Sequence, residues 1–160
     1  MNRPYFIRAL IRKIRYALRG TGSNVWIHDG RIFVEGFEDL ETVTDRVTRV
    51  FGVHSVCPAV EMPKEDFDAL CAQAAAMMAG MKGTFRVNAR RSDKRYPMTS
   101  PEINAEMGGR ILEVNPDLRV DLHEPEHVMN VEIRDSAYLY VKVCLLVICL
   151  SFLSFSTSFR

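Results

Sequence analysis

The chain has 160 residues, of which 48% are hydrophobic, and a formal net charge of +1 at pH 7. These values suit one ordinary domain or two small ones with a buried core, and they argue against a disordered chain. The charge is unevenly distributed, because 12 of the 21 basic residues lie within residues 1–19 and 82–95. We therefore expect a positive and a negative side on the protein.

The first part of the chain alternates between helix and strand patterns. Apolar residues at helical spacing from Phe6 to Leu18 predict an amphipathic helix. Its opposite face carries four arginines within about 60° of one another, namely Arg8, Arg12, Arg15 and Arg19. The dipeptide Asp29-Gly30 between two β-rich runs predicts a hairpin. A helix near residues 40–50 and a strand near 55–60 follow.

This order becomes the βαββαβ ferredoxin-like unit if one further strand precedes it. Either another element fills that position or the start of the chain is truncated, and we favour truncation. The fold class is α/β (α+β). We expect a truncated ferredoxin-like domain over residues 1–62 and an α/β domain with a mixed sheet over 63–143. Residues 144–160 form a divergent apolar tail.

The second unit contains the strongest candidate site. Alternation of Phe85, Val87 and Ala89 with polar residues predicts a half-buried strand, and Thr99 with Glu102 predicts a capping box at the start of a helix. The turn between them holds four basic residues and one acid: Arg90, Arg91, Lys94, Arg95 and Asp93. Helix-terminal amides together with guanidinium groups bind phosphate without reading sequence, so we predict a phosphate-binding corner. A solvated loop is the alternative.

Two further features of the following helix stay open between two interpretations. Glycine inside a helix costs about 1 kcal/mol relative to alanine, so Gly108-Gly109 indicates a close approach by another backbone or close helix–sheet packing. Arg110 either faces the same ligand or pairs with Glu106 or Glu113.

The sequence contains no pattern that we would assign to catalysis or to a metal. His123 and His127 have a His-x-x-x-His spacing, but Pro125 interrupts it. No Gly-x-Ser-x-Gly motif, glycine-rich phosphate loop or zinc pattern is present. We therefore predict no catalytic residue, no metal and no cofactor in this chain.

The cysteines and the C-terminal run bear on location. The four cysteines form no Cys-x-x-Cys pair, and the charged N-terminus does not match a secretory signal, so we expect reduced thiols and a cytoplasmic protein. The apolar run from Val143 is about 13 residues long, short of the roughly 20 that span a bilayer. We predict a buried strand followed by an out-of-frame tail rather than a membrane anchor.

Two motifs resemble the N-terminal half of bacterial tRNA 4-thiouridine synthases, the tRNA sulfurtransferases shared with thiamine biosynthesis. The first is Asn2-Arg3-Pro4-Tyr5-Phe6, and the second is Gly83-Thr-Phe-Arg-Val-Asn-Ala-Arg-Arg-Ser-Asp-Lys followed by Thr99-Ser-Pro-Glu-Ile-Asn. The resemblance covers about residues 2–143. It implies a ferredoxin-like domain followed by a THUMP domain, an RNA-binding module that also occurs in other RNA-modifying enzymes.

The resemblance implies that the chain holds the tRNA acceptor arm while an ATP-using PP-loop domain and a sulfur-donor protein thiolate uridine 8. The Ser-Gly-Gly-x-Asp-Ser loop of that domain and a catalytic cysteine are missing, so we expect no activity from this chain alone. A separate PP-loop chain or a homodimer would be its partner. The implied RNA face consists of Arg86, Arg90, Arg91, Lys94, Arg95, Asn104, Gly108 and Arg110, together with the four arginines of the first helix.

Three alternatives remain beside this function. The first alternative is that the chain is a protein-interaction or small-ligand module, because ferredoxin-like units serve many purposes and fold does not decide function. The second is that it is the THUMP module of another RNA-modifying enzyme. The third is that it is a non-functional remnant that folds poorly.

Overall fold

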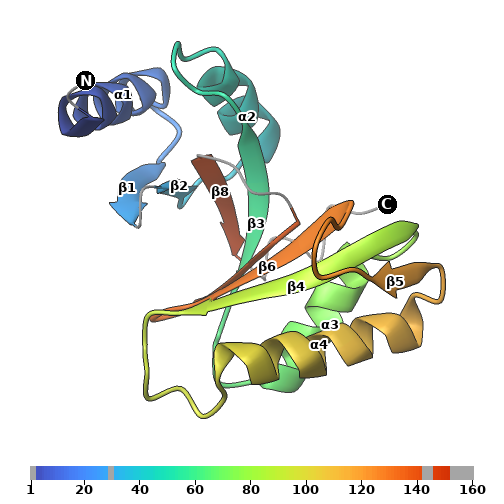
Figure 1. Cartoon of the computed structure of the whole chain (residues 1–160). Helices are drawn as coiled ribbons and strands as arrows, with labels where there is room; N and C mark the ends of the chain where they lie inside the picture. Colours follow the sequence, from blue (N-terminus) through green and yellow to red (C-terminus); the bar gives the residue numbers. More distant parts are fainter. Residues whose placement is uncertain (1–2, 29–30, 142–145, 152–160) are drawn as a thin grey trace. The chain divides into compact units, whose positions relative to one another are not determined.

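The computed structural model describes residues 3–28, 31–141 and 146–151 (Figure 1). The chain divides into two compact units. Unit 1 consists of residues 1–59 and 144–160, and unit 2 consists of residues 60–143. The strand β3 (Val56–Met62) contributes its first residues to unit 1 and its last to unit 2.

Unit 1 contains the predicted order of helices and strands. Its elements are α1 (Arg3–Ala17), β1 (Asn24–His28), β2 (Arg31–Glu35), α2 (Leu40–Thr48) and the first part of β3. β1 and β2 pair antiparallel, which confirms the hairpin, although the Asp29-Gly30 turn itself lies outside the described residues. The core is formed by the apolar stripe of α1 packed with residues of α2 and β2, including Leu10, Ile14, Val47 and Val34.

A strand from the C-terminal run completes the sheet of unit 1. β8 (Leu146–Ser151) lies between β2 and β3, and it pairs parallel with β2 so that Ile32 is opposite Leu146. This is the position that the first strand takes in a βαββαβ unit. Of the two explanations for the incomplete order, the sequence favours a truncated start, whereas the structure shows the other one, an element that fills the position. The physical reason is that a sheet with an empty central position leaves backbone donors and acceptors unpaired on both sides.

Unit 2 is an α/β layer with the mixed sheet that the sequence predicts. Its elements are α3 (Phe67–Met77), β4 (Gly83–Arg91), α4 (Ser100–Val114), β5 (Leu118–Val120), β6 (His127–Ile133) and β7 (Ala137–Tyr140). The strand order is β3-β7-β6-β4-β5. β4 is parallel to β5 and β6, whereas β7 is antiparallel to β6 and β3. Figure 1 shows α3 and α4 on one face of this sheet.

The pattern of β4 positions the candidate site. Phe85, Val87 and Ala89 are buried, and α4, whose Ile103 and Met107 are buried, packs on this strand. Thr99 caps α4, and Glu102 completes the predicted capping box. Because β4 and α4 pack side by side, the turn between them lies at one end of the layer.

The sequence also provided expectations for the redox state of the cysteines and for membrane-spanning segments. No helix in the described ranges is long and apolar enough to cross a membrane. Cys71 is a free, buried thiol, as expected. Cys57 is disulfide-bonded, so the expectation of reduced thiols is wrong for this residue.

Candidate nucleic-acid interface

The turn between β4 and α4 is organised around Asp93. Its Oδ1 accepts hydrogen bonds from the backbone N–H of Arg95 at 2.9 Å and from Nε of the same residue at 3.2 Å. Its Oδ2 lies 3.5 Å from Nζ of Lys64. The Arg95 backbone N–H, followed by the Arg95 side chain, holds the pKa of Asp93 below its ordinary value. Asp93 therefore stays ionised at neutral pH, and its hydrogen bonds fix the conformation of the turn.

A second set of contacts ties the turn to the segment before α3. The hydroxyl of Tyr96 donates to the carbonyl oxygen of Lys64 at 3.0 Å, and Nη1 of Arg91 donates to the carbonyl oxygen of Tyr96 at 3.3 Å. Beside these contacts lies a surface cavity of about 380 Å³, lined in part by Phe67, Tyr96 and Met98. The turn is thus a shaped surface rather than a loose loop.

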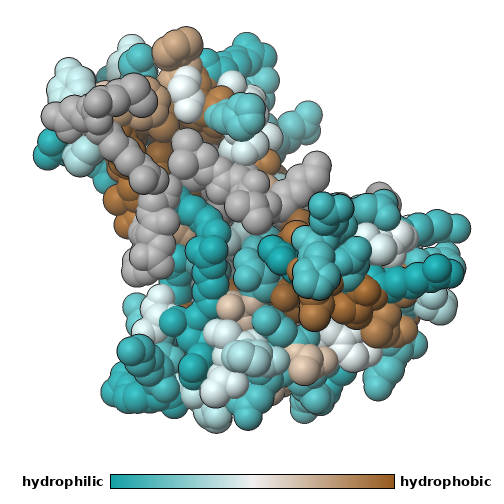
Figure 2. All heavy atoms as spheres, in the orientation of Figure 1, coloured by the Kyte–Doolittle hydropathy of each residue, from teal (hydrophilic) through white to brown (hydrophobic). Residues whose placement is uncertain are grey.

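The basic residues of the turn differ in how they present their charge. Arg90 and Lys94 are exposed, and the Arg95 side chain is 92% exposed beside Asp93. Arg86 and Arg91 are half-buried, and Nη1 of Arg86 donates to the carbonyl oxygen of Leu122 at 3.1 Å. Figure 2 shows hydrophilic side chains gathered at this end of unit 2. Three of the five basic side chains predicted here therefore direct their charge to solvent.

The predicted residues of α4 have internal contacts. Oδ1 of Asn104 accepts from the backbone N–H of Ala89 at 2.8 Å. Gly108 is buried, and a Cβ there would lie 3.8 Å from Cγ2 of Val87, which favours close helix–sheet packing. Arg110 pairs with Glu106, one of its two expected partners, and with Asp68 of α3. These three residues hold α4 in place beside the turn.

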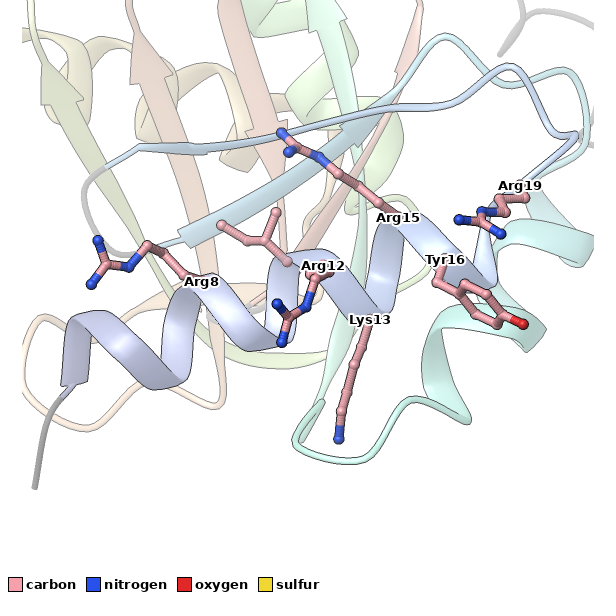
Figure 3. A pocket seen from close by; sticks show the side chains of 7 residues that line it. Arg8, Arg12, Lys13, Arg15, Tyr16 and Arg19 are labelled. Carbon is pink, nitrogen blue, oxygen red and sulfur yellow. The ribbon is translucent and has the colours of Figure 1, made fainter.

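The four arginines of α1 line an open groove of about 780 Å³ together with Ile11, Lys13 and Tyr16 (Figure 3). Arg12 and Lys13 point away from the strands, whereas Arg15 reaches toward them. Nη2 of Arg15 donates to the carbonyl oxygen of Val25 at 2.7 Å. All four arginines are exposed, and α1 contains no acidic residue to offset them.

Sequence reasoning missed two residues of this groove, Lys13 and Tyr16. Both lie outside the narrow ridge of arginines on the helical wheel. Tyr16 is four positions after Arg12 and three before Arg19, so it adjoins the ridge, and Lys13 lies three positions before Tyr16. The guanidinium carbon of Arg19 lies 4.5 Å from the centre of the Tyr16 ring. An exposed tyrosine within a basic face is the signal that would have identified the pair.

The exposed basic side chains of the two surfaces are chemically suited to binding an anionic polymer. Within the described ranges, no group of three or more histidine, cysteine or acidic residues is placed to hold a metal ion. Burial, as the largest effect, raises the pKa of the Cys71 thiol to about 11. That thiol is therefore protonated at neutral pH and is a poor nucleophile.

Family models match both units. Residues 1–57 match the ThiI ferredoxin-like domain, and residues 64–142 match the THUMP domain. Among curated proteins, the probable tRNA sulfurtransferase of Moorella thermoacetica is 43% identical over 145 residues, and that of Clostridium acetobutylicum is 42% identical over 143. Each alignment covers 89% of this chain but 37% of the relative, so the chain spans little more than a third of their length.

Solved structures agree with these matches. A crystal structure of a 4-thiouridine synthetase–RNA complex with bound ATP aligns with a TM-score of 0.67 and 26% identity. The alignment covers 94% of this chain and 38% of that one. A Pyrococcus horikoshii protein aligns with a TM-score of 0.64 and 26% identity, over 91% of this chain and 52% of the other.

Proposed function

Because the chain belongs to the family that joins a ThiI ferredoxin-like domain to a THUMP domain, we propose that it is the tRNA-binding module of a tRNA sulfurtransferase. The observation that carries the proposal is the presence in each unit of an exposed basic surface built on a rigid element. In unit 1 it is the outer face of α1, and in unit 2 it is the turn after β4. Such surfaces position a nucleic acid through its phosphates without reading its sequence.

The predicted residues divide into two roles in this proposal. Direct phosphate contacts come from six exposed side chains, namely Arg90, Lys94, Arg95, Arg8, Arg12 and Arg19. The others shape the surface through their internal hydrogen bonds, close packing or ion pairs, namely Arg86, Arg91, Asn104, Gly108, Arg110 and Arg15.

The chemistry of the proposed enzyme lies outside this chain. We propose that the module positions the acceptor arm of tRNA so that a PP-loop domain, using ATP and a sulfur-donor protein, thiolates uridine 8. The partner that we propose for the module is a separate chain that carries the PP-loop domain, or a second copy of the module in a homodimer. The module would act in the cytoplasm, where its tRNA is found.

The proposal predicts a salt-dependent affinity that depends on the turn. In the Arg90→Ala, Lys94→Ala double variant, tRNA affinity should fall. The slope of log affinity against log salt should flatten by about two units, one for each phosphate that the variant no longer neutralises. The measurement is tRNA binding by fluorescence anisotropy across a range of salt concentrations.

Lys82→Ala is the matched control for this experiment. Lys82 is 79% exposed and pairs with Asp117 just before β4, so it carries the same charge at the end of the strand away from the turn. Its removal should leave the slope nearly unchanged. A wild-type chain that does not bind tRNA would contradict the proposed function, and equal slopes in the double variant and the control would contradict the assignment to this turn.

A further inference from the structure

Phe51 and Tyr16 are exposed aromatic residues of unit 1 that lie outside its hydrophobic core. Phe51 is 85% exposed, the highest value among the large hydrophobic residues described, and Tyr16 of α1 is 68% exposed. An exposed aromatic ring contributes less to the stability of the fold than a buried one. Rings of this kind, placed among cations, are the usual components of surfaces on which nucleic-acid bases stack.

The turn that carries Phe51 is rigid. It follows α2, and the backbone N–H of Val53 donates to the carbonyl oxygen of Val50 at 3.1 Å. Gly52 has a φ of +100°, which is the conformation required at the third position of a type II turn. The Phe6 ring of α1 packs over it, since a Cβ on Gly52 would lie 3.2 Å from Cζ of Phe6. Val50 is buried, so the turn is held on both sides while Phe51 points outward.

Cations of α1 accompany both rings. Nζ of Lys13 lies 5.7 Å from the centre of the Phe51 ring, and the guanidinium carbon of Arg19 lies 4.5 Å from the centre of the Tyr16 ring. Both distances are within the range of cation–π interaction. Lys13 precedes Tyr16 by three positions, so the two side chains share one face of α1. The two rings therefore border the same basic surface.

We propose that Phe51 and Tyr16 are stacking platforms for unpaired bases of an RNA, with Lys13 and Arg19 contacting its phosphates. The inference rests on the proposed function and deepens it, because it assigns a single-stranded segment to this face of unit 1. Charge complementarity supports RNA as the occupant, since α1 contributes several basic side chains and no acid. A surface that binds a protein partner through apolar contacts would not require a cation beside each aromatic ring.

The test compares single-stranded RNA with a blunt RNA duplex of the same length. Phe51→Ala should weaken binding of the single strand about 5- to 150-fold, the range for loss of one stacked base. Its effect on the duplex should be small. The salt slope should stay unchanged, because every cation that neutralises a phosphate remains. Fluorescence of 2-aminopurine within the single strand reports stacking directly and should be less quenched by the variant than by wild type.

Phe51→Leu and Phe51→Trp separate stacking from general apolar contact. Leucine keeps an apolar side chain but lacks a π face, so it should behave like alanine, whereas tryptophan should restore binding. Arg49→Ala, at a neighbouring exposed residue that pairs with Asp45, is the control for the α2 surface. Because Phe51 is exposed, all variants should keep the thermal transition of wild type.

The outcomes distinguish the two proposals. If wild type binds neither RNA, the proposed function fails and the stacking site fails with it. If wild type binds RNA but Phe51→Ala binds the single strand equally well, the stacking site alone is overturned. Full binding by Phe51→Leu would also overturn it, and so would self-association of the chain that Phe51→Ala abolishes while RNA affinity is unchanged.

Discussion

Arg90 and Arg91 are adjacent on β4, but their side chains lie on opposite faces of the strand. Arg90 is exposed on the face away from the helices, whereas Arg91 shares the parity of the buried Val87 and Ala89. The guanidinium of Arg91 donates to the carbonyl oxygen of Tyr96, and its charge lowers the pKa of Glu102 as a minor contribution beside the hydrogen bonds from Thr99. Identical residue types thus serve different purposes, one facing solvent and one holding the turn.

This difference predicts unequal effects on stability. Arg91→Ala should lower the free energy of unfolding by about 1 kcal/mol, because it removes a partly buried hydrogen bond to the turn. Arg90→Ala should change it by less than about 0.5 kcal/mol, as is usual for an exposed side chain. Urea denaturation of the two variants checks the prediction, which fails if Arg90→Ala is the more destabilising.

At the scale of the element, α4 begins with a complete capping box. Oε2 of Glu102 accepts from the backbone N–H of Thr99 at 2.6 Å and from its hydroxyl at 2.8 Å, and the Thr99 hydroxyl accepts from the backbone N–H of Glu102. These bonds satisfy donors that a helix start otherwise leaves without a partner. They also occupy part of the helix N-terminus, so any phosphate bound at this corner relies mainly on the turn.

The capping box makes stability depend on pH. The backbone hydrogen bond from Thr99, the largest cause, lowers the pKa of Glu102 below its ordinary value of 4.5. The carboxylate therefore stabilises the fold at pH values above 4.5, and this contribution is lost as pH falls through the lowered pKa. Glu102→Gln should be less stable than wild type at neutral pH, and the difference should shrink in acid. Urea denaturation of wild type and Glu102→Gln, at neutral pH and at an acidic pH below the lowered pKa, measures the difference in the free energy of unfolding. A difference that grows in acid would contradict the prediction.

At the scale of the whole molecule, β8 connects the end of the chain to the fold of unit 1. It is hydrogen-bonded between β2 and β3, which are separated from it by more than 80 residues of sequence. Unit 2 lies between these segments in the sequence and forms a compact unit with its own two helices, α3 and α4. The two units should therefore respond differently to loss of the C-terminal segment.

Deletion of residues 144–160 should unfold unit 1 selectively. Without β8, the strands β2 and β3 lose their shared partner, and the backbone donors and acceptors along their facing edges are left unpaired. Amide hydrogen exchange should show loss of protection in β1, β2 and α2, while β4 and β6 of unit 2 stay protected. Uniform loss of protection in both units, or none in unit 1, would contradict the independence of the two.

The sequence by itself determined the order of the elements in each unit, the capping box at Thr99 and the position of the basic turn. These features follow from periodicity and from residues close together in the chain, which is why local reasoning reached them. Only the tertiary structure decided that β8 completes unit 1, that Arg110 pairs with Asp68, that Arg91 faces inward and that Phe51 stands exposed beside Lys13. Each of these depends on contacts between segments distant in the sequence, and no local pattern specifies which distant segment will be the neighbour.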